Sequence, residues 1–343
     1  VEVTIDPALQ QAAYDQLVGP GYEGSAVAIQ PSTGKILAMA SNPGYNPNDL
    51  MGDSAEETWA NLQEQEGQPL VNHAGAETLP PGSIFKIITT AAGLNNGFDP
   101  SSTLTGSNVI TLPDTVTELT NYANQKCNGQ DAVTLQTAFA LSCNTAFVEM
   151  SEQLGADELR KYAKAFGVGE NYDLGVSTSA GTLGDLPDGA ATAQSAIGQR
   201  DVTMTALQAA VMAGTVANKG TRMQPYLVNR ITDAQMKDVR TTKPKKADQA
   251  VNEETAATLT DLMYASERSS WGYDGNGFAS KTGTAEHGEG LAPHVWYVAF
   301  DPERDIAVGV VVKNGGNLGE SATGGKVSGP IGRAILRAYQ GEQ

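Results

Sequence analysis

The sequence predicts an α+β protein: an antiparallel β-sheet flanked by helices, with an inserted all-helical subdomain. Two observations predict this class. Strand-like runs occur near both ends of the chain, and the block between them has helical periodicity. Because a two-stranded hairpin alone is marginally stable, we expect the early and late strands to share one sheet. We therefore predict a single domain over residues 1–343, with a sheet subdomain from residues 1–82 and 221–343 and a mostly helical subdomain from residues 83–220.

The first elements follow from capping and turn signals. Asp6 followed by Pro7 indicates a helix start, and we expect this helix to reach about residue 18. The apolar runs 25–30 and 35–40 are separated by the turn-rich tetrapeptide PSTG, which predicts a β-hairpin. Residues 43–82 are rich in glycine, proline, asparagine and acids, so we expect mostly loop with one short helix.

The later elements follow from periodicity. Apolar residues recur at helical spacing in four segments, which are residues 83–94, 134–155, 156–169 and 203–220. After Gly220, one helix with acidic residues at its start is expected near residues 252–266. Three strand-like runs and a last helix close the chain, at residues 278–285, 294–300, 305–313 and 329–340.

Composition and charge narrow the class of function. Hydrophobic residues make up 40% of the chain and charged residues 18%, which is typical of a globular protein. The formal net charge of −17 argues against nucleic acid as a partner, because nucleic-acid binding requires a basic surface. The longest apolar runs, such as residues 306–312, are far shorter than the ~20 residues of a membrane span.

The chain has two cysteines, Cys127 and Cys143. Two thiols alone do not supply the four ligands of a structural zinc site, so we expect no metal site. The pair is consistent with a disulfide in an exported protein, or with two buried thiols in a cytosolic one.

Ser83 and Lys86 form the first candidate motif, in the stretch PPGSIFKI. On a helix, residues three apart lie on one face. A serine hydroxyl becomes a good nucleophile when a neighbouring base takes its proton, and lysine is such a base only when neutral. Lowering a lysine pKa from about 10.4 to near 7 requires roughly 4 kcal/mol, which burial and a second cation can supply. The alternative is a simple helix cap, since S-x-x-K occurs about once by chance in such a chain.

A second S-x-x-K in the same chain shows that the pattern also occurs by chance. Ser32 and Lys35 match the pattern, but they fall in the predicted hairpin turn. Helical facing does not apply in a turn, so we expect no chemistry from this pair.

Two further motifs follow Ser83. Ser142 and Asn144 flank Cys143, and a break between helices would let both polar side chains point one way. A hydroxyl can relay a proton and an amide can hold a substrate, although a polar helix junction is the alternative. The third motif comprises Lys281, Thr282, Gly283 and Thr284 in a predicted strand, where a lysine and two hydroxyls could bind a carboxylate. Its alternative is a solvated edge strand.

The order of the three motifs is more specific than any one of them. S-x-x-K, S-x-N and K-T-G follow one another with 59 and then 139 residues between their first residues. This order resembles the set of penicillin-binding proteins and class A β-lactamases. The segments TIDPALQQAA, QSAIGQRDVTMTALQAA and HVWYVAFDP extend the resemblance over nearly the whole chain. The sequence is therefore similar to the transpeptidase domain of penicillin-binding proteins, of the monofunctional class B type found in actinobacteria, and the resemblance implies the penicillin-recognising, β-lactamase-like fold.

The resemblance implies a role for each motif residue. Ser83 would be the acylated nucleophile, Lys86 its general base, and Ser142 the proton relay to the leaving amine. Asn144 would bind the substrate backbone, and the K-T-G segment would hold a carboxylate through Lys281, Thr282, Gly283 and Thr284. Backbone N–H groups of Ser83 and Thr284 would form the oxyanion hole. Histidine has no part in this scheme, so His73, His287 and His294 are given no catalytic role.

The implied reaction is peptidoglycan D,D-transpeptidation with no cofactor. The partners would be a D-Ala-D-Ala stem peptide, β-lactams, and membrane proteins of division or elongation. The implied location is the extracytoplasmic face of the cell membrane, with an anchoring helix that precedes Val1. Export favours a disulfide between Cys127 and Cys143.

Three other functions share the first motif. A D,D-carboxypeptidase transfers the same acyl group to water, and the motifs do not separate it from a transpeptidase. A class A β-lactamase requires a glutamate in an E-x-x-L-N setting after the second motif, and the chain has no such run. A non-catalytic β-lactam sensor is the third, and it belongs to a different class of protein.

Overall fold

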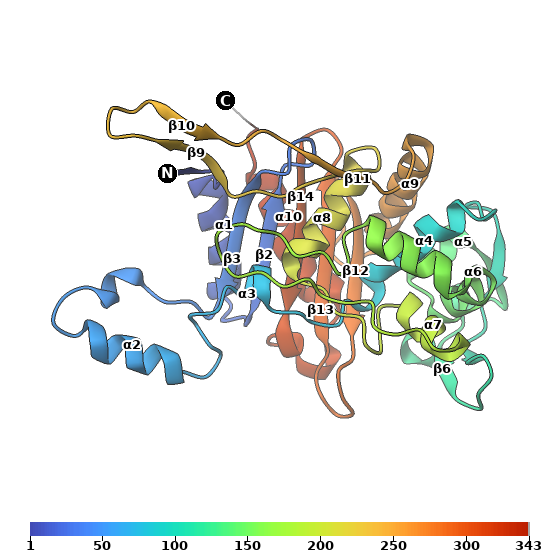
Figure 1. The fold of residues 1–343 in the computed structure, drawn as a ribbon. Coiled ribbons are helices and arrows are strands. Elements are labelled where there is room, and N and C mark those ends of the chain that lie inside the picture. The colour runs from blue at the N-terminus through green and yellow to red at the C-terminus, as the bar shows by residue number, and fades with distance from the viewer. Residues whose placement is uncertain (342–343) are drawn as a thin grey trace.

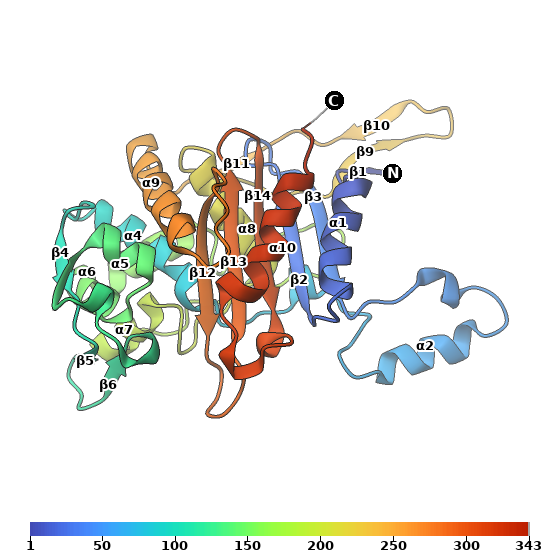
Figure 2. The same cartoon turned by 180° about the vertical axis from the view of Figure 1, so that it is seen from behind.

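The fold is organised around a five-stranded antiparallel sheet with the strand order β12-β13-β14-β2-β3. It is seen in a computed structural model that describes residues 1–341 (Figures 1 and 2). Two strands come from the start of the chain and three from its end: β2 (Gly24–Ile29), β3 (Ile36–Asn42), β12 (Ala279–Ala285), β13 (His294–Asp301) and β14 (Ile306–Val312). The prediction that early and late strands share one sheet is confirmed, because β2 pairs with β14.

Helices cover both faces of this sheet. Helix α8 (Ala206–Ala217) lies on one face, and α1 (Pro7–Val18) and α10 (Gly324–Ala338) lie on the other. As predicted, Asp6 caps α1, with its carboxylate accepting hydrogen bonds from the backbone N–H groups of Ala8 and Leu9. Helix α8 approaches β14 closely because Gly309 has no side chain: a Cβ there would lie 2.5 Å from the backbone N of Ala210. Strands β13 and β14 are buried throughout, which explains their nearly continuous apolar sequence.

The segment between β3 and α8 contains further helices. These are α2 (Ala55–Glu64), α3 (His73–Ala76), α4 (Lys86–Leu94), α5 (Leu135–Leu141), α6 (Asn144–Ala165) and α7 (Gly189–Ala196). Helices α4, α5, α6 and α7 gather beside the β12 edge of the sheet (Figure 1). Helix α9 (Glu253–Ser269) connects the sheet to this helical lobe, because it packs against α4 and α5 as well as β12.

The inserted segment is not all-helical, which corrects the sequence prediction. It also contains two short antiparallel pairs, β4 (Thr103–Thr105) with β7 (Ala132–Thr134), and β5 (Val109–Thr111) with β6 (Glu118–Thr120). Strands of three residues are too short for an alternating pattern to stand out in the sequence. In addition, α8 falls within residues 83–220 but packs on the sheet. We propose that the division into a sheet part and a helical part is best drawn ahead of α8.

The remaining elements lie around this body. A three-stranded sheet comprises β1 (Glu2–Val3), β9 (Val228–Thr232) and β10 (Asp238–Thr241), and a pair comprises β8 (Thr221–Met223) and β11 (Lys246–Gln249). Helix α2 and the β9–β10 hairpin project beyond the body in both views (Figures 1 and 2). Six short 3-10 helices are described: η1 (Pro47–Leu50), η2 (Gly82–Phe85), η3 (Tyr122–Asn124), η4 (Cys127–Gly129), η5 (Lys313–Gly315) and η6 (Gly319–Ser321). Within the described residues, no helix has the length and apolar character needed to cross a membrane.

A buried carboxylate ties α9, α10 and β12 together. Glu267 of α9 accepts hydrogen bonds from Arg333 Nε at 2.7 Å, from the Tyr297 hydroxyl at 2.9 Å, and from the Ser280 hydroxyl. Asn276 Nδ2 donates a further bond to Glu267 at 3.0 Å. Burial raises the pKa of Glu267, but these donors outweigh burial and hold the pKa below its ordinary value. The network fixes β12 from the side of Ser280, while the neighbouring Lys281 points to the opposite side of the strand.

Candidate active site

Ser83 lies in a short turn, and the residues just before it are held by hydrogen bonds from two other parts of the chain. The turn is η2, and α4 begins directly after it at Lys86. The backbone N–H of Gly82 donates to Gly198 O at 2.9 Å, and Trp296 Nε1 donates to Pro80 O at 2.9 Å. The alternative interpretation of Ser83 as a helix cap is not what the structure shows: a turn of 3-10 helix precedes α4, and no side-chain cap is formed at either start. The residues just before Ser83 are thus tied to the sheet through Trp296 of β13, and to the segment after α7 through Gly198.

Two glycines allow this turn to touch β12. A Cβ on Gly283 would lie 2.8 Å from Pro81 O and 3.2 Å from the Ile84 backbone N. A Cβ on Gly82 would lie 2.7 Å from Thr284 O, and Gly82 has a positive φ of +54° that L-residues rarely adopt. Both contacts are to backbone atoms, which cannot rotate away. The glycine of the K-T-G motif therefore sets the distance between β12 and the Ser83 turn.

Lys86 is fully buried and connects the first two motifs. Its Nζ lies 2.7 Å from Asn144 Oδ1, 2.9 Å from Ser142 O and 3.2 Å from Ser142 Oγ. Burial, and secondly the charge of Lys281, lower the pKa of Lys86 well below its ordinary value. A neutral amine has two hydrogens, which suit Ser142 O and Asn144 Oδ1. Its lone pair is then available to a hydroxyl, as a general base requires.

Ser142 and Asn144 lie at a break between helices, as predicted. Ser142 ends α5 with a left-handed φ of +59°, and Asn144 begins α6. Asn144 Nδ2 donates to Thr120 O at 3.1 Å, so both ends of this amide are engaged, one with Lys86 and the other with the β6 segment. The Asn144 side chain thus orients Lys86 in addition to any contact with a substrate.

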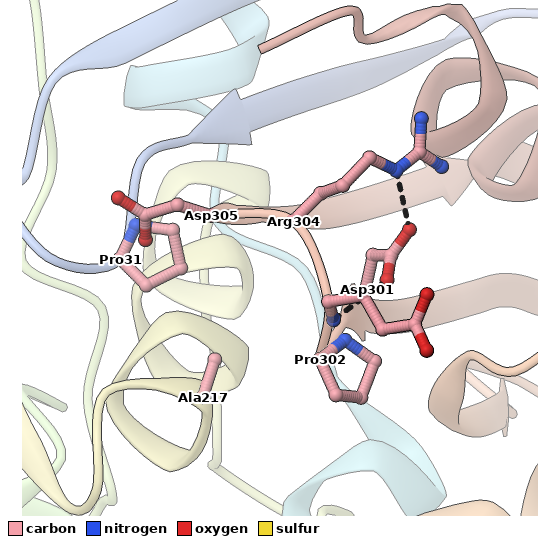
Figure 3. Close-up of a pocket in the computed structure, with 7 residues that line it drawn as sticks. Pro31, Ala217, Asp301, Pro302, Arg304 and Asp305 are labelled. Carbon is pink, nitrogen blue, oxygen red and sulfur yellow. Dashed lines mark hydrogen bonds and ion pairs between the residues drawn. The ribbon is translucent and has the colours of Figure 1, made fainter. Parts of the chain in front are cut away.

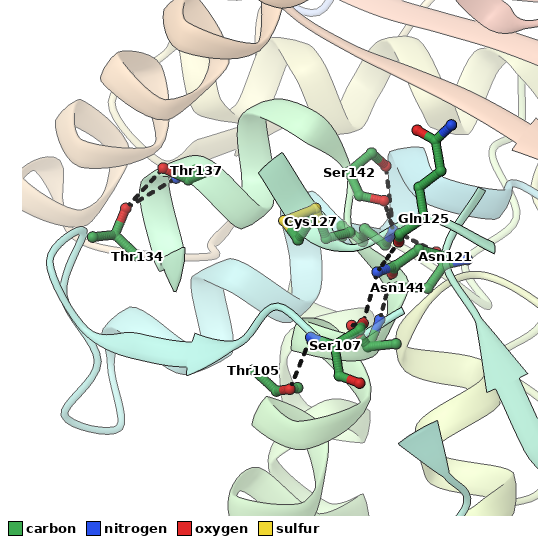
Figure 4. The surroundings of a disulfide bond; sticks show 12 residues. Thr105, Ser107, Asn121, Gln125, Cys127, Thr134, Thr137, Ser142 and Asn144 are labelled. Atoms are coloured by element: carbon green, nitrogen blue, oxygen red, sulfur yellow. Dashed lines mark hydrogen bonds between the residues drawn. A yellow bond between two sulfur atoms is a disulfide. The ribbon is translucent and has the colours of Figure 1, made fainter. Parts of the chain in front are cut away.

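Cys143, between these two residues, is bonded to Cys127 with a Cα–Cα distance of 5.7 Å. The disulfide joins the loop that contains η4 to the junction of α5 and α6. Figure 4 shows Ser142 and Asn144 beside this disulfide, with Asn121 and Ser107 in the same hydrogen-bond network. Asn121 Nδ2 donates to Ser107 O at 2.9 Å, and Asn121 Oδ1 accepts from the Thr145 backbone at 3.0 Å. The second motif is therefore tied covalently and by hydrogen bonds to the wall formed by residues 119–124.

The third motif lies on β12, the edge strand of the sheet. Lys281 is buried, its Nζ donates to Thr282 O at 3.1 Å, and burial lowers its pKa to about 7. Side chains alternate along a strand, so Thr282 and Thr284 share a face. Both threonines line a cleft of about 760 Å³.

This cleft brings the three motifs together. It is lined by Ser83, Ser142, Asn144, Thr282 and Thr284, and also by Leu119, Thr120, Asn121, Tyr122, Ala123, Asn124, Leu141, Ile197, Gln199, Glu286 and Thr323. Lys86 and Lys281 lie beside it, buried. Within residues 1–341, the Ser83 hydroxyl makes no hydrogen bond, so it is free to react with a ligand in the cleft.

Three parts of the cleft lining were not predicted from the sequence: the wall formed by residues 119–124, Gln199 and Glu286. The wall carries no motif, and its place depends on the β5–β6 pair. Glu286 could have been found, because it continues the alternation of Thr282 and Thr284 along the strand.

The residues that were given no catalytic role lie elsewhere. Ser32 lies in the β2–β3 turn, as expected, and its hydroxyl and backbone N–H both donate to Asp305 in the β13–β14 turn. His73 Nδ1 lies 3.1 Å from Glu77 Oε2, and the rings of His287 and His294 stack 3.9 Å apart. A smaller pocket of about 230 Å³, beside the β13–β14 turn, is lined by none of the motif residues (Figure 3).

Comparison with known proteins identifies the family. The penicillin binding protein transpeptidase domain matches residues 24–337. The chain belongs to this family. It is 45% identical to peptidoglycan D,D-transpeptidase PbpA of Mycolicibacterium smegmatis, over 98% of this chain and 72% of that protein. It is 42% identical to PbpA of Mycobacterium tuberculosis, over 100% of this chain and 73% of that protein. The predicted class B, actinobacterial type is confirmed.

Solved structures agree with this assignment. Penicillin-binding protein A from M. tuberculosis, as a penicillin G acyl-enzyme complex, has a TM-score of 0.94 at 41% identity. The match covers 98% of this chain and 80% of that one. The ceftriaxone acyl-enzyme complex of the same protein has a TM-score of 0.95, over 99% and 80% of the two chains. The predicted penicillin-recognising transpeptidase fold is therefore confirmed.

Proposed function

We propose that this chain is a serine-type peptidoglycan D,D-transpeptidase that acts on D-Ala-D-Ala stem peptides. One observation carries the proposal: Ser83 lines the same cleft as the S-x-N and K-T-G residues, and the buried Lys86, whose pKa is lowered, is hydrogen-bonded to Ser142 and Asn144 of that lining. Catalytic groups with strongly shifted pKa values in a cleft are typical of an active site. Family membership and the named relatives support the same reaction.

Substrate binding begins with the carboxylate of the terminal D-Ala. Lys281 and the hydroxyls of Thr282 and Thr284 would hold it, and its charge would raise the pKa of Lys281 from about 7 and keep that lysine protonated. An extended peptide can add to the free edge of β12 by backbone hydrogen bonds. Such pairing would place the last peptide bond of the stem over Ser83.

Acylation follows by proton transfer. Neutral Lys86 takes the proton of Ser83 Oγ, and Oγ attacks the carbonyl carbon of the penultimate D-Ala. The backbone N–H groups of Ser83 and Thr284 stabilise the oxyanion. Ser142, which is hydrogen-bonded to Lys86, passes the proton to the leaving nitrogen. The C–N bond breaks, D-Ala leaves, and an ester on Ser83 remains.

Deacylation by an amine completes the reaction. The amine of a second stem attacks the ester carbonyl, a new amide forms, and one amine proton returns to Ser83 Oγ. If water attacks instead, the same enzyme acts as a D,D-carboxypeptidase, which is the second candidate function. β-Lactams acylate the same serine, because their strained amide replaces the D-Ala-D-Ala bond.

The test is labelled penicillin with wild-type protein and with Ser83→Ala, read by intact mass. We expect one adduct on the wild type and none on the variant. The matched control is Ser32→Ala, which removes the serine of the other S-x-x-K and should leave the adduct intact. No adduct on the wild type, or an equal adduct on Ser83→Ala, would overturn the proposal.

The reaction implies a location. Stem peptides are found outside the cytoplasmic membrane, so we propose that the chain works on the extracytoplasmic face and is held there by an anchoring helix that precedes Val1. Membrane proteins of division or elongation are its proposed partners. The Cys127–Cys143 disulfide supports this location, because disulfides persist in oxidising compartments.

A further inference from the structure

Glu286 is the one carboxylate among the described residues that line the cleft. It follows β12 directly, at the end opposite to Lys281. Its side chain is exposed, and within residues 1–341 it has neither an ion-pair nor a hydrogen-bond partner. The cleft therefore offers a free negative charge to whatever lies along this end of the strand.

The position of Glu286 follows from strand geometry. Thr282, Thr284 and Glu286 are two residues apart and share the face of β12 that borders the cleft. At about 3.3 Å per residue, Glu286 lies roughly 13 Å along the strand from Thr282. Thr282 belongs to the proposed carboxylate site, so Glu286 marks the far end of the bound peptide.

The stem peptide has a group that suits this place. In the proposed reaction an amine of one stem is the acceptor, and where that amine is on a side chain, a donor stem of the same kind carries it too. In an extended peptide, the residue before D-Ala-D-Ala begins about two residues, or roughly 7 Å, from the terminal residue. A side chain of lysine length then covers the remaining distance to Glu286.

We propose that Glu286 binds the cationic side-chain amine of the donor stem residue that precedes D-Ala-D-Ala, and so selects donors whose amine is still free. This inference rests on the proposed function, since it assumes that the stem lies along β12. An ammonium paired with an exposed carboxylate gains a modest, salt-sensitive interaction. Glu286 is thus a specificity residue, and it acts on the substrate without a part in proton transfer.

The experiment compares two donor peptides that differ by one charge. One is acetyl-L-Lys-D-Ala-D-Ala with a free side-chain amine, and the other has the same amine acetylated. The released D-Ala gives kcat/KM for each, and their ratio is the preference for the charged donor. The variants are Glu286→Gln and Glu286→Lys. The matched control is Glu289→Gln, which removes the same charge from the same β12–β13 turn but does not line the cleft.

We expect the wild type to prefer the free amine by about three- to fivefold, the upper range for an exposed ion pair. Glu286→Gln should bring the ratio near one, Glu286→Lys should bring it below one, and Glu289→Gln should retain the preference. High salt should reduce the wild-type ratio. The inference is overturned if the wild type has no preference, or if Glu286→Gln keeps it.

A failure of the proposed transpeptidase function would give a different result from a failure of the role of Glu286. In that case the wild type would release D-Ala from neither peptide and would form no penicillin adduct on Ser83. A folded enzyme that acts on both peptides without preference contradicts the role of Glu286 alone. The penicillin adduct on each variant also shows that the variant is folded.

Discussion

At the scale of single residues, two buried lysines are central to the chemistry proposed for the cleft. In the proposed mechanism, Lys86 must be neutral to take a proton, and Lys281 must be charged to hold a carboxylate. Burial favours the neutral form of both, and the charge of Lys281 further lowers the pKa of Lys86. We expect bound substrate to separate their roles, because its carboxylate would raise the pKa of Lys281 and leave Lys86 as the base.

A pH profile tests this coupling. Penicillin acylation should increase with pH as Lys86 loses its proton, with an apparent pKa well below 10.4. Lys281→Met removes the like charge, so it should raise the pKa of Lys86 and move the rise in acylation rate to higher pH. It should also lower the rate, because carboxylate binding is lost. The measurement is the second-order acylation rate against pH. Lys245→Met, at an exposed site, is the control and should not change the pH at which the acylation rate rises. If the acylation rate of Lys281→Met rises at the same pH as that of the wild type, the coupling between Lys281 and Lys86 is contradicted.

The motif residues could be predicted from the sequence because each has a characteristic chemistry and order. The structure brings Ser83, Ser142, Asn144, Thr282 and Thr284 to one cleft. The hydrogen bond between Asn144 and Lys86 could not be predicted, since it depends on the depth at which Lys86 is buried. The wall at residues 119–124 was missed for a similar reason: its residues become functional only through their position.

At the scale of elements, the contact between β12 and the turn that contains Ser83 positions this proposed nucleophile. Gly283→Ala would place a Cβ 2.8 Å from Pro81 O, and the turn would have to move. We expect penicillin acylation to fall at least tenfold, because displacements of about 1 Å can cost a hundredfold in rate. The free energy of unfolding should fall by only about 1–3 kcal/mol, as in other overpacked sites.

The control for this prediction is Gly277→Ala, six residues earlier, where an added Cβ would meet nothing within 4 Å. Acylation and stability should both stay near the wild-type values there. Stopped-flow acylation and urea denaturation measure the two quantities. Equal acylation rates in the two variants would show that the glycine contact does not position Ser83.

Elements with strong local signals were predicted, and those without were not. The Asp6 cap, the β2–β3 hairpin and the three late strands follow from capping residues, turns and apolar runs. Helix α10 begins at Gly324, five residues before the predicted start, because its first turn contains glycines that local propensity disfavours. The three-residue strands of the insertion depend on tertiary contacts and leave no pattern.

At the scale of the whole molecule, the sheet and the helical lobe form the two sides of one cleft. Strand β12 supplies one wall, and the α5–α6 junction with residues 119–124 supplies the other. The sequence predicted that early and late strands pair, because two strands alone are marginal. It did not predict that α8 would cover the sheet or that α2 would project, since an amphipathic pattern does not identify the surface on which a helix packs.

The central claim is that the Ser83 ester is resolved by an amine. The most direct measurement incubates the protein with a D-Ala-D-Ala stem peptide and increasing amounts of an amine acceptor, and identifies the products by mass spectrometry. We expect D-Ala release together with a new amide between donor and acceptor, which grows at the expense of the hydrolysed donor and is absent with Ser83→Ala. Hydrolysed donor as the sole product at every acceptor concentration would contradict the claim and show a D,D-carboxypeptidase instead.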